Sequence, residues 1–183
     1  MSATELSCDD SEPPSRNFEL FFNIADDVNS TSVPSAQTLS DWALHTVKGV
    51  PSYDANVVYE VSLSVVTAPA IQALNCDYRN KNTPTNVLSF PSDMPLMPAT
   101  DNSAMHRALG DIVLCASVIE AEATEQNKQL NHHWAHMVVH SVLHLFEYDH
   151  ELDDEANAME ALEVTLLQGL SISNPYSNVA SNS

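Results

Sequence analysis

The chain contains few basic residues. Six lysines and arginines stand among its 183 residues, against 25 aspartates and glutamates, and the formal net charge is −19. A surface this acidic repels nucleic acid at long range. Composition alone therefore argues against an RNA or DNA partner, and it favours a solvated acidic coat that keeps the protein in solution.

Cysteine is also scarce. Cys8, Cys76 and Cys115 form an odd set without a Cys-x-x-Cys pair. This pattern argues against a disulfide scaffold and against a thiolate zinc site, and it indicates a reducing compartment, for which the cytoplasm is the default.

Long apolar runs are missing as well. No stretch of about 20 apolar residues is present, so we expect no membrane span. The first ten residues carry acidic side chains where a secretory signal would carry basic ones, and they lack an apolar segment, so we expect no such signal.

The chain has the length of one domain and a hydrophobic fraction of 44%, which is ordinary for a globular protein. Residues 1–16 are polar, acidic and proline-containing, and are expected to be a disordered lead-in. Residues 17–176 are expected to form the domain, and residues 177–183 a disordered tail.

Hydrophobic patterning predicts four short strands and five helices. The strands are expected over 18–24, 57–66, 83–91 and 110–115, and residues 92–106 are expected to be a surface loop. Helices are expected to open near Pro34 and Pro69, and then over 116–129, 132–146 and from 153 to about 170. Three helices bunched after the strands indicate an α+β fold with a small mixed sheet.

The most informative segment runs from residue 140 to residue 150. His140 and His144 lie four residues apart and would share one face of a helix, and His150 follows just beyond its end. Neutral imidazole is a preferred ligand of zinc. Three histidines leave the fourth coordination position free for water, as catalytic zinc requires.

A second choice of ligands remains open. His136, His140 and His144 form a stripe, but the outer two are about 12 Å apart along a straight helix. They cannot share an ion whose bonds to nitrogen are about 2.0–2.1 Å. His136 with His140 therefore ranks behind the trio of His140, His144 and His150.

The spacing also matches the zinc-peptidase pattern H-E-x-x-H-x-x-G-x-x-H, with one difference. Ser141 stands where the peptidase has its general base. A serine hydroxyl cannot hold a proton at neutral pH as a carboxylate does. Metal-assisted hydrolysis survives this difference, whereas peptide hydrolysis loses its usual base.

Three blocks of sequence resemble the YbeY endoribonuclease family. Residues 140–150 resemble its H-G-x-x-H-L-x-G-Y-D-H signature, residues 78–91 resemble Y-R-x-K-D-x-P-T-[DN]-V-L-S-F-P, and residues 109–113 resemble L-G-D-I-x. Residues 133–140 are similar to the approach to the family's metal helix. The likeness covers roughly residues 18–176, in order.

This resemblance implies one α+β domain whose metal site, with one Zn²⁺ per chain, lies at the end of a central helix. The family's ligands fall on His140, His144 and His150, and its functional arginine falls on Arg79. A guanidinium forms paired hydrogen bonds with phosphate and is always charged. Lys81 is a further candidate for binding substrate.

Asp149 is a candidate to orient a metal ligand, with a simple turn residue as the alternative. Two departures from the family are Ser141 and Glu147, which replace glycines. Glycine usually takes the left-handed conformation at a helix end. At Glu147, either this conformation costs about 1–2 kcal/mol or the backbone takes another route.

The sequence therefore predicts a zinc-dependent, single-strand-specific endoribonuclease. The resemblance implies a role in small-subunit rRNA maturation at the 3′ end of 16S rRNA and in ribosome quality control. Its implied partners are rRNA precursor, the small ribosomal subunit and its proteins, with no membrane and no DNA. The alternatives are a zinc metallopeptidase-like hydrolase with Glu147 or Glu151 as base, and a non-catalytic ribosome-assembly factor with a structural zinc.

Overall fold

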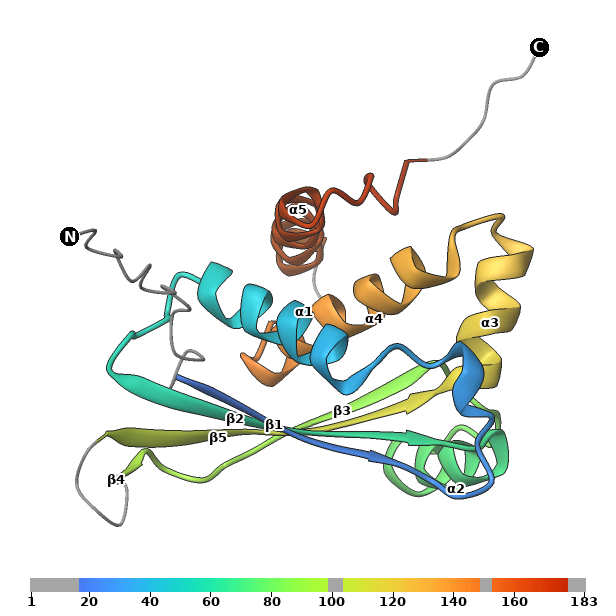
Figure 1. The fold of residues 1–183 in the computed structure, drawn as a ribbon, viewed down its shortest axis with the longest axis horizontal. Helices are drawn as coiled ribbons and strands as arrows, with labels where there is room; N and C mark the ends of the chain where they lie inside the picture. The colour runs from blue at the N-terminus through green and yellow to red at the C-terminus, as the bar shows by residue number, and fades with distance from the viewer. Residues whose placement is uncertain (1–16, 99–103, 149–152, 178–183) are drawn as a thin grey trace, which may run out of the picture.

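The fold is described by a computed structural model that covers residues 17–98, 104–148 and 153–177. One sheet lies between a single helix on one face and several helices on the other (Figure 1). Its strands are β1 (Phe18–Ile24), β2 (Val57–Val66), β3 (Val87–Pro91), β4 (Met97–Pro98) and β5 (Met105–Cys115).

The sheet is mixed. Its strands are ordered β1-β2-β5-β3, and β4 pairs with the start of β5. β1, β2 and β5 run parallel to one another, whereas β3 and β4 run antiparallel to β5. β2 alternates buried and partly buried residues along most of its length, as expected of a strand between two unequal layers.

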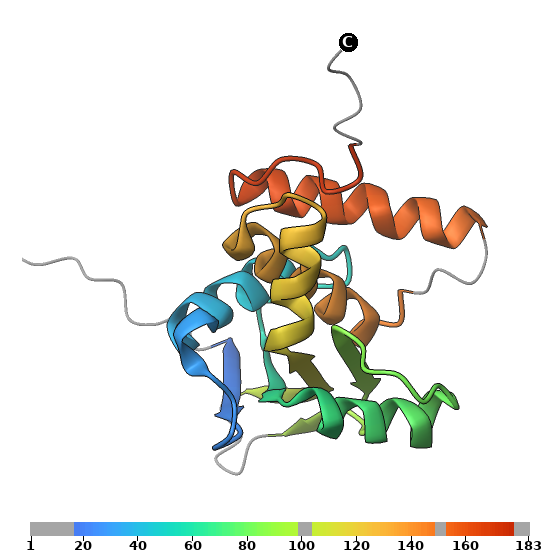
Figure 2. The same ribbon diagram turned by 90° about the vertical axis from the view of Figure 1, so that its right-hand side faces the viewer.

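The described part of the chain has five α-helices, four of which lie against the sheet. α2 (Ala68–Arg79) lies on one face, while α1 (Ala36–Gly49), α3 (Ala116–Glu125) and α4 (Leu130–Leu145) lie on the other. α5 (Asp153–Gly169) lies over α1 and α4 as an outer layer (Figure 2). A short 3₁₀ turn, η1 (Ser30–Ser32), precedes α1.

α4 is the central helix, because it is buried on two faces. Eleven of its 16 residues are buried. One stripe, containing Trp134, Val138 and Val142, packs into the core against the sheet. Another, containing Ala135, Val139 and Leu143, packs with residues of α5. Only the remaining stripe is left to carry polar side chains toward open space.

The predicted α+β class is confirmed, but the sheet has five strands in the described residues rather than about four. The prediction of a loop over 92–106 was wrong, because it holds β4 and the first residues of β5. Gly110 explains the error. Its φ of +134° and a register shift opposite Glu60 and Val61 interrupt the pattern inside one continuous strand.

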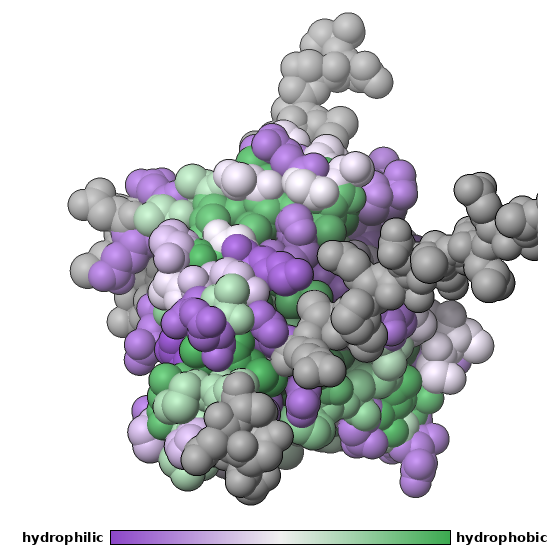
Figure 3. Space-filling model, turned by 60° about the vertical axis from the view of Figure 1, so that its left-hand side comes forward, coloured by the Kyte–Doolittle hydropathy of each residue, from purple (hydrophilic) through white to green (hydrophobic). Residues whose placement is uncertain are grey.

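Exposed apolar side chains concentrate near β4. Met94, Leu96 and Met97 come from one short segment and are each more than 40% exposed. Figure 3 shows one end of the molecule, where green hydrophobic residues gather along the lower part between purple hydrophilic ones.

Within the described residues, no helix is both long and apolar enough to cross a membrane.

Candidate active site

A cleft of about 580 Å³ joins the end of α2 to the end of α4. Arg79 and Lys81 line it from one side, and His140 and His144 line it from the other. The segment 83–91, which includes β3, contributes much of the wall between them. Four of the six predicted site residues thus share one cleft, although more than 55 residues separate the two pairs in the sequence.

The end of α2 brings its two cations to the rim of the cleft. Asn80 takes a left-handed conformation with φ of +56°, which ends the helix and turns the chain back. The Asn75 side chain then donates to the Thr83 carbonyl oxygen at 2.8 Å and holds the returning segment before β3. Arg79 and Lys81 are exposed, so both can meet a charged group that enters the cleft.

The two histidines of α4 face each other. Their Nε2 atoms are 3.1 Å apart, and their rings are nearly perpendicular with centroids 4.5 Å apart. Two nitrogens bound to one tetrahedral zinc would be about 3.4 Å apart. The observed pair therefore fits two ligands of a single ion, as the i, i+4 spacing predicts.

Glu163 from α5 orients His140 from behind. Its side chain is completely buried, and its Oε1 accepts a hydrogen bond of 2.7 Å from Nδ1 of His140. With the proton on Nδ1, the Nε2 lone pair faces the cleft, which is the state that a metal ligand needs. The Tyr176 hydroxyl donates to Oε2 of the same carboxylate.

The charge of Glu163 is stabilised by its donors. Burial alone raises the pKa of this carboxyl, but hydrogen bonds from His136, His140 and Tyr176 outweigh burial and lower it to about 2. Burial and the Glu163 charge together raise the pKa of Tyr176. The carboxylate is therefore ionised at neutral pH and its tyrosine neighbour is protonated.

Sequence patterning did not single out Glu163, although a signal exists. It lies four residues after Met159 and four before Leu167, both of which are buried. These positions form one face of α5, so an acidic residue stands in the middle of an apolar stripe. An isolated carboxylate in such a stripe needs a partner, and a histidine-rich neighbouring helix can supply it.

The remaining predicted site residues cannot be compared with the structure. His150 and Asp149 lie outside the described residues, as does Glu151. Within 17–98, 104–148 and 153–177, no group of three histidine, cysteine or acidic side chains is arranged to hold a metal. His136, the second-ranked ligand, approaches Glu163 instead, with Nε2 3.4 Å from Oε2.

The two replaced glycines behave differently. Ser141 is fully buried, and its hydroxyl donates to the Met137 carbonyl oxygen at 2.6 Å, so it is accommodated inside the helix. Glu147 has φ of +64°, so of the two alternatives the chain takes the left-handed conformation rather than another backbone route. Its N–H donates to the His144 carbonyl oxygen at 2.9 Å, and its exposed side chain lines the cleft.

Comparison with known proteins gives consistent matches. The family model described as endoribonuclease YbeY matches residues 23–171. The endoribonuclease YbeY of Alcanivorax borkumensis is 44% identical over 149 residues, which is 81% of this chain and 82% of that relative. The solution structure of TM1509 from Thermotoga maritima covers 90% of this chain and 100% of its own, with a TM-score of 0.53 and 24% identity.

The structural likeness supports the fold alone, whereas the sequence matches support the activity. They define a metal-dependent endoribonuclease, a hydrolase that cuts phosphodiester bonds within RNA. Within this class, the chain belongs to the YbeY family. The family match decides among the three functions that the sequence left open in favour of the nuclease.

Proposed function

We propose that this endoribonuclease holds one zinc ion with His140, His144 and His150 and uses it to cut single-stranded rRNA precursor. The observation that carries the proposal is the pair of facing Nε2 atoms, 3.1 Å apart, in the same cleft as Arg79. When bound, zinc supplies Lewis acidity that lowers the pKa of water toward neutrality.

The residues behind the pair prepare it for this role. Glu163 keeps the His140 proton on Nδ1 and fixes the ring, because its buried carboxylate accepts from that atom at 2.7 Å. The apolar packing of α4 against α5 holds Glu163 in place. The ring therefore needs little reorganisation to take up a metal.

Arg79 is the residue that binds the phosphate. Its exposed guanidinium lines the cleft opposite the histidines, so it can bind the scissile phosphate and neutralise charge that builds in the transition state. Lys81 adds a second positive charge at the rim and contributes to substrate binding. Asp149 orients one of the ligands beyond the helix end.

The substrate is the precursor of small-subunit rRNA, cut near the 3′ end of 16S rRNA during late maturation and quality control. The small ribosomal subunit and its proteins are the partners, and the cytoplasm is the compartment. Two features support a protein partner and this compartment. A net charge of −19 weakens unaided RNA binding and favours delivery by a protein. Cys76 and Cys115 are both free, in keeping with a reducing compartment.

The test compares zinc content and rRNA cleavage in matched variants. His144→Ala should lose both zinc and cleavage, whereas His132→Gln on the same helix should keep its zinc. Arg79→Ala should keep its zinc and lose at least about 100-fold in cleavage rate. Lys48→Ala, which removes a cation from the last turn of α1, should cleave like the parent.

Two outcomes would contradict the proposal. A His144→Ala protein that lacks zinc and still cleaves at the parent rate would remove the metal from the mechanism. Unchanged cleavage by Arg79→Ala would remove the guanidinium from it.

A further inference from the structure

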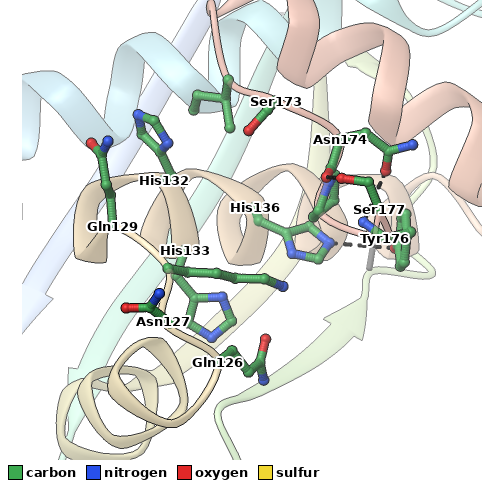
Figure 4. A pocket seen from close by; sticks show the side chains of 13 residues that line it. Gln126, Asn127, Gln129, His132, His133, His136, Ser173, Asn174, Tyr176 and Ser177 are labelled. Carbon is green, nitrogen blue, oxygen red and sulfur yellow. Dashed lines mark hydrogen bonds between the residues drawn. The ribbon is translucent and has the colours of Figure 1, made fainter. Parts of the chain in front are cut away.

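A second cavity, of about 730 Å³, lies beside the N-terminal half of α4 (Figure 4). It is bordered by the α3–α4 connection over 126–129, by three histidines of α4, and by the C-terminal segment over 172–177. The volume falls within the range of small-molecule sites. None of its lining residues also lines the cleft that contains Arg79.

One stripe of α4 links the two cavities. His132 and His136 line the second cavity, and His140 and His144 continue at the same spacing into the cleft. A step of four residues advances about 6 Å along a helix. Glu163 stands between the cavities, because it contacts both His136 and His140. A ligand in the second cavity would therefore lie one or two helical turns from the metal ligands.

Two buried imidazoles, His133 and His136, border this cavity. Nε2 of His133 lies 2.8 Å from Oε2 of Glu122, and Nε2 of His136 lies 3.4 Å from Oε2 of Glu163. Since carboxylates only accept, both Nε2 atoms carry the proton, and both Nδ1 atoms are left with a lone pair. Neither Nδ1 has a hydrogen-bond partner among the described residues, although both atoms are buried.

Burial favours the neutral form of His133. Burial lowers the pKa of His133 and outweighs the hydrogen bond and the charge of Glu122, which raise it. A buried acceptor without a donor costs free energy, so such atoms mark places that a water or a ligand fills. The rings lie 6.3 Å apart and line the same cavity, which suits a ligand with an amino group.

The rest of the lining matches the other parts of a nucleotide. Side-chain amides of Gln126, Gln129 and Asn174 provide both donors and acceptors, as the edge of a base requires. The Tyr176 ring is 41% exposed and can stack on a base. Lys128 provides one of the chain's six basic side chains, suited to a phosphate.

We propose that the second cavity binds one nucleotide of the RNA substrate, with a base that carries an exocyclic amino group and with its phosphate near Lys128. The proposal rests on the endoribonuclease function and deepens it, because a bound nucleotide beside α4 fixes which phosphate of the strand reaches Arg79. Adenine and cytosine satisfy the two Nδ1 acceptors, whereas uracil has no amino group to offer.

Mononucleotides test the binding without any need for cleavage. In ¹H–¹⁵N spectra of the full chain, adenosine and cytidine monophosphates should shift amide signals of residues 126–136 and 172–177. Uridine monophosphate should bind about tenfold more weakly, because it leaves buried acceptors unpaired. Equal binding of all three nucleotides, or no shift in these segments, would overturn the proposal.

Variants connect this binding to the reaction. Lys128→Met should weaken adenosine monophosphate binding about fivefold and raise KM for an RNA with adenine or cytosine at the bound position, with kcat unchanged. Lys48→Met, which removes an equal charge elsewhere, should change neither. Arg79→Ala should abolish cleavage and leave mononucleotide binding intact, which separates this proposal from the catalytic one. An unchanged KM in Lys128→Met would overturn it.

Two other occupants are excluded by the same measurements. If Zn²⁺ alone shifts the cavity signals and the nucleotides do not, the imidazoles belong to a metal site. If nucleotides bind only after residues 178–183 are removed, the cavity holds the chain's own terminus. Binding of adenosine monophosphate to the full chain at the same signals, with zinc already bound, supports the proposal against both.

Discussion

Both cavities along α4 pair histidines with carboxylates, but the carboxylates contact different ring nitrogens in the two cavities. In the cleft, a buried carboxylate accepts from Nδ1 of His140, and Nε2 of His140 faces Nε2 of His144. In the second cavity, carboxylates accept at Nε2 of His133 and His136, and the Nδ1 atoms are left. The position of the carboxylate therefore decides which nitrogen of each histidine is offered, and to what kind of ligand.

We expect the largest effect from Glu163→Gln, because Glu163 contacts histidines of both cavities. Loss of the charge should weaken zinc binding by about tenfold or more and lower the free energy of unfolding of the metal-free protein by about 1–3 kcal/mol. Chelator competition and urea unfolding measure these two effects. Glu160→Gln, an exposed neighbour on α5, is the matched control. Zinc affinity equal to that of the parent would show that the carboxylate does not prepare His140.

The pH dependence of the free energy of unfolding tests the state of His133 beside the second cavity. The folded pKa of His133 is lowered, chiefly by burial, so the unfolded chain takes up this proton first as pH falls. The stability that neutral His133 contributes is present above its unfolded pKa of about 6.5 and is lost as pH falls toward the folded pKa. Between pH 7.5 and 5.5, the free energy of unfolding should fall more steeply in the parent than in His133→Gln.

The slope of the free energy of unfolding against pH can differ between the parent and His133→Gln by at most about 1.4 kcal/mol per pH unit, because one proton is involved. Urea unfolding at several pH values measures it, and His132→Gln, next along the chain and only partly buried, serves as control. Parallel curves for the parent and His133→Gln would show that the imidazole is not held neutral by its surroundings.

The smallest effect concerns the two ends of α4. The end at the cleft has Glu147 at φ of +64° directly after the helix, whereas the nearest positive φ before α4 is at Asn127, in the α3–α4 connection. Glu147→Gly should relieve this conformation and stabilise the protein by about 1 kcal/mol in urea unfolding. Glu147→Ala removes the charge but keeps the β-carbon, so it should give little of the gain. Equal gains from both variants would assign the effect to charge.

Sequence patterning predicted the local elements better than their assembly. The i, i+4 spacing predicted that His140 and His144 face one way, and helix-end chemistry identified Glu147 as the position where the backbone would be strained or rerouted. That Arg79 lies across the cleft from them depends on β3 and on the turn at Asn80, which join segments far apart in the chain. Spacing within one segment contains no such information, and for Arg79 only the family resemblance supplied it.

Glu163 and β5 were harder for a different reason. A single glutamate in a helix rich in acids looks like one more solvated charge, and only its position on the buried face distinguishes it. The start of β5 was hidden because a glycine inside a strand resembles the beginning of one. In both cases, tertiary packing overrode what the residue type suggests by itself.

Gly110 also constrains how the cleft can evolve. A β-carbon at this position would lie 2.1 Å from the Phe90 carbonyl oxygen, so any side chain would push β3 away from β5. Val87, Leu88 and Ser89 of β3 are part of the cleft wall. A mutation at a residue outside the cleft lining would thus distort the cleft wall, and tolerance of change should be lower at this glycine than at many rim positions.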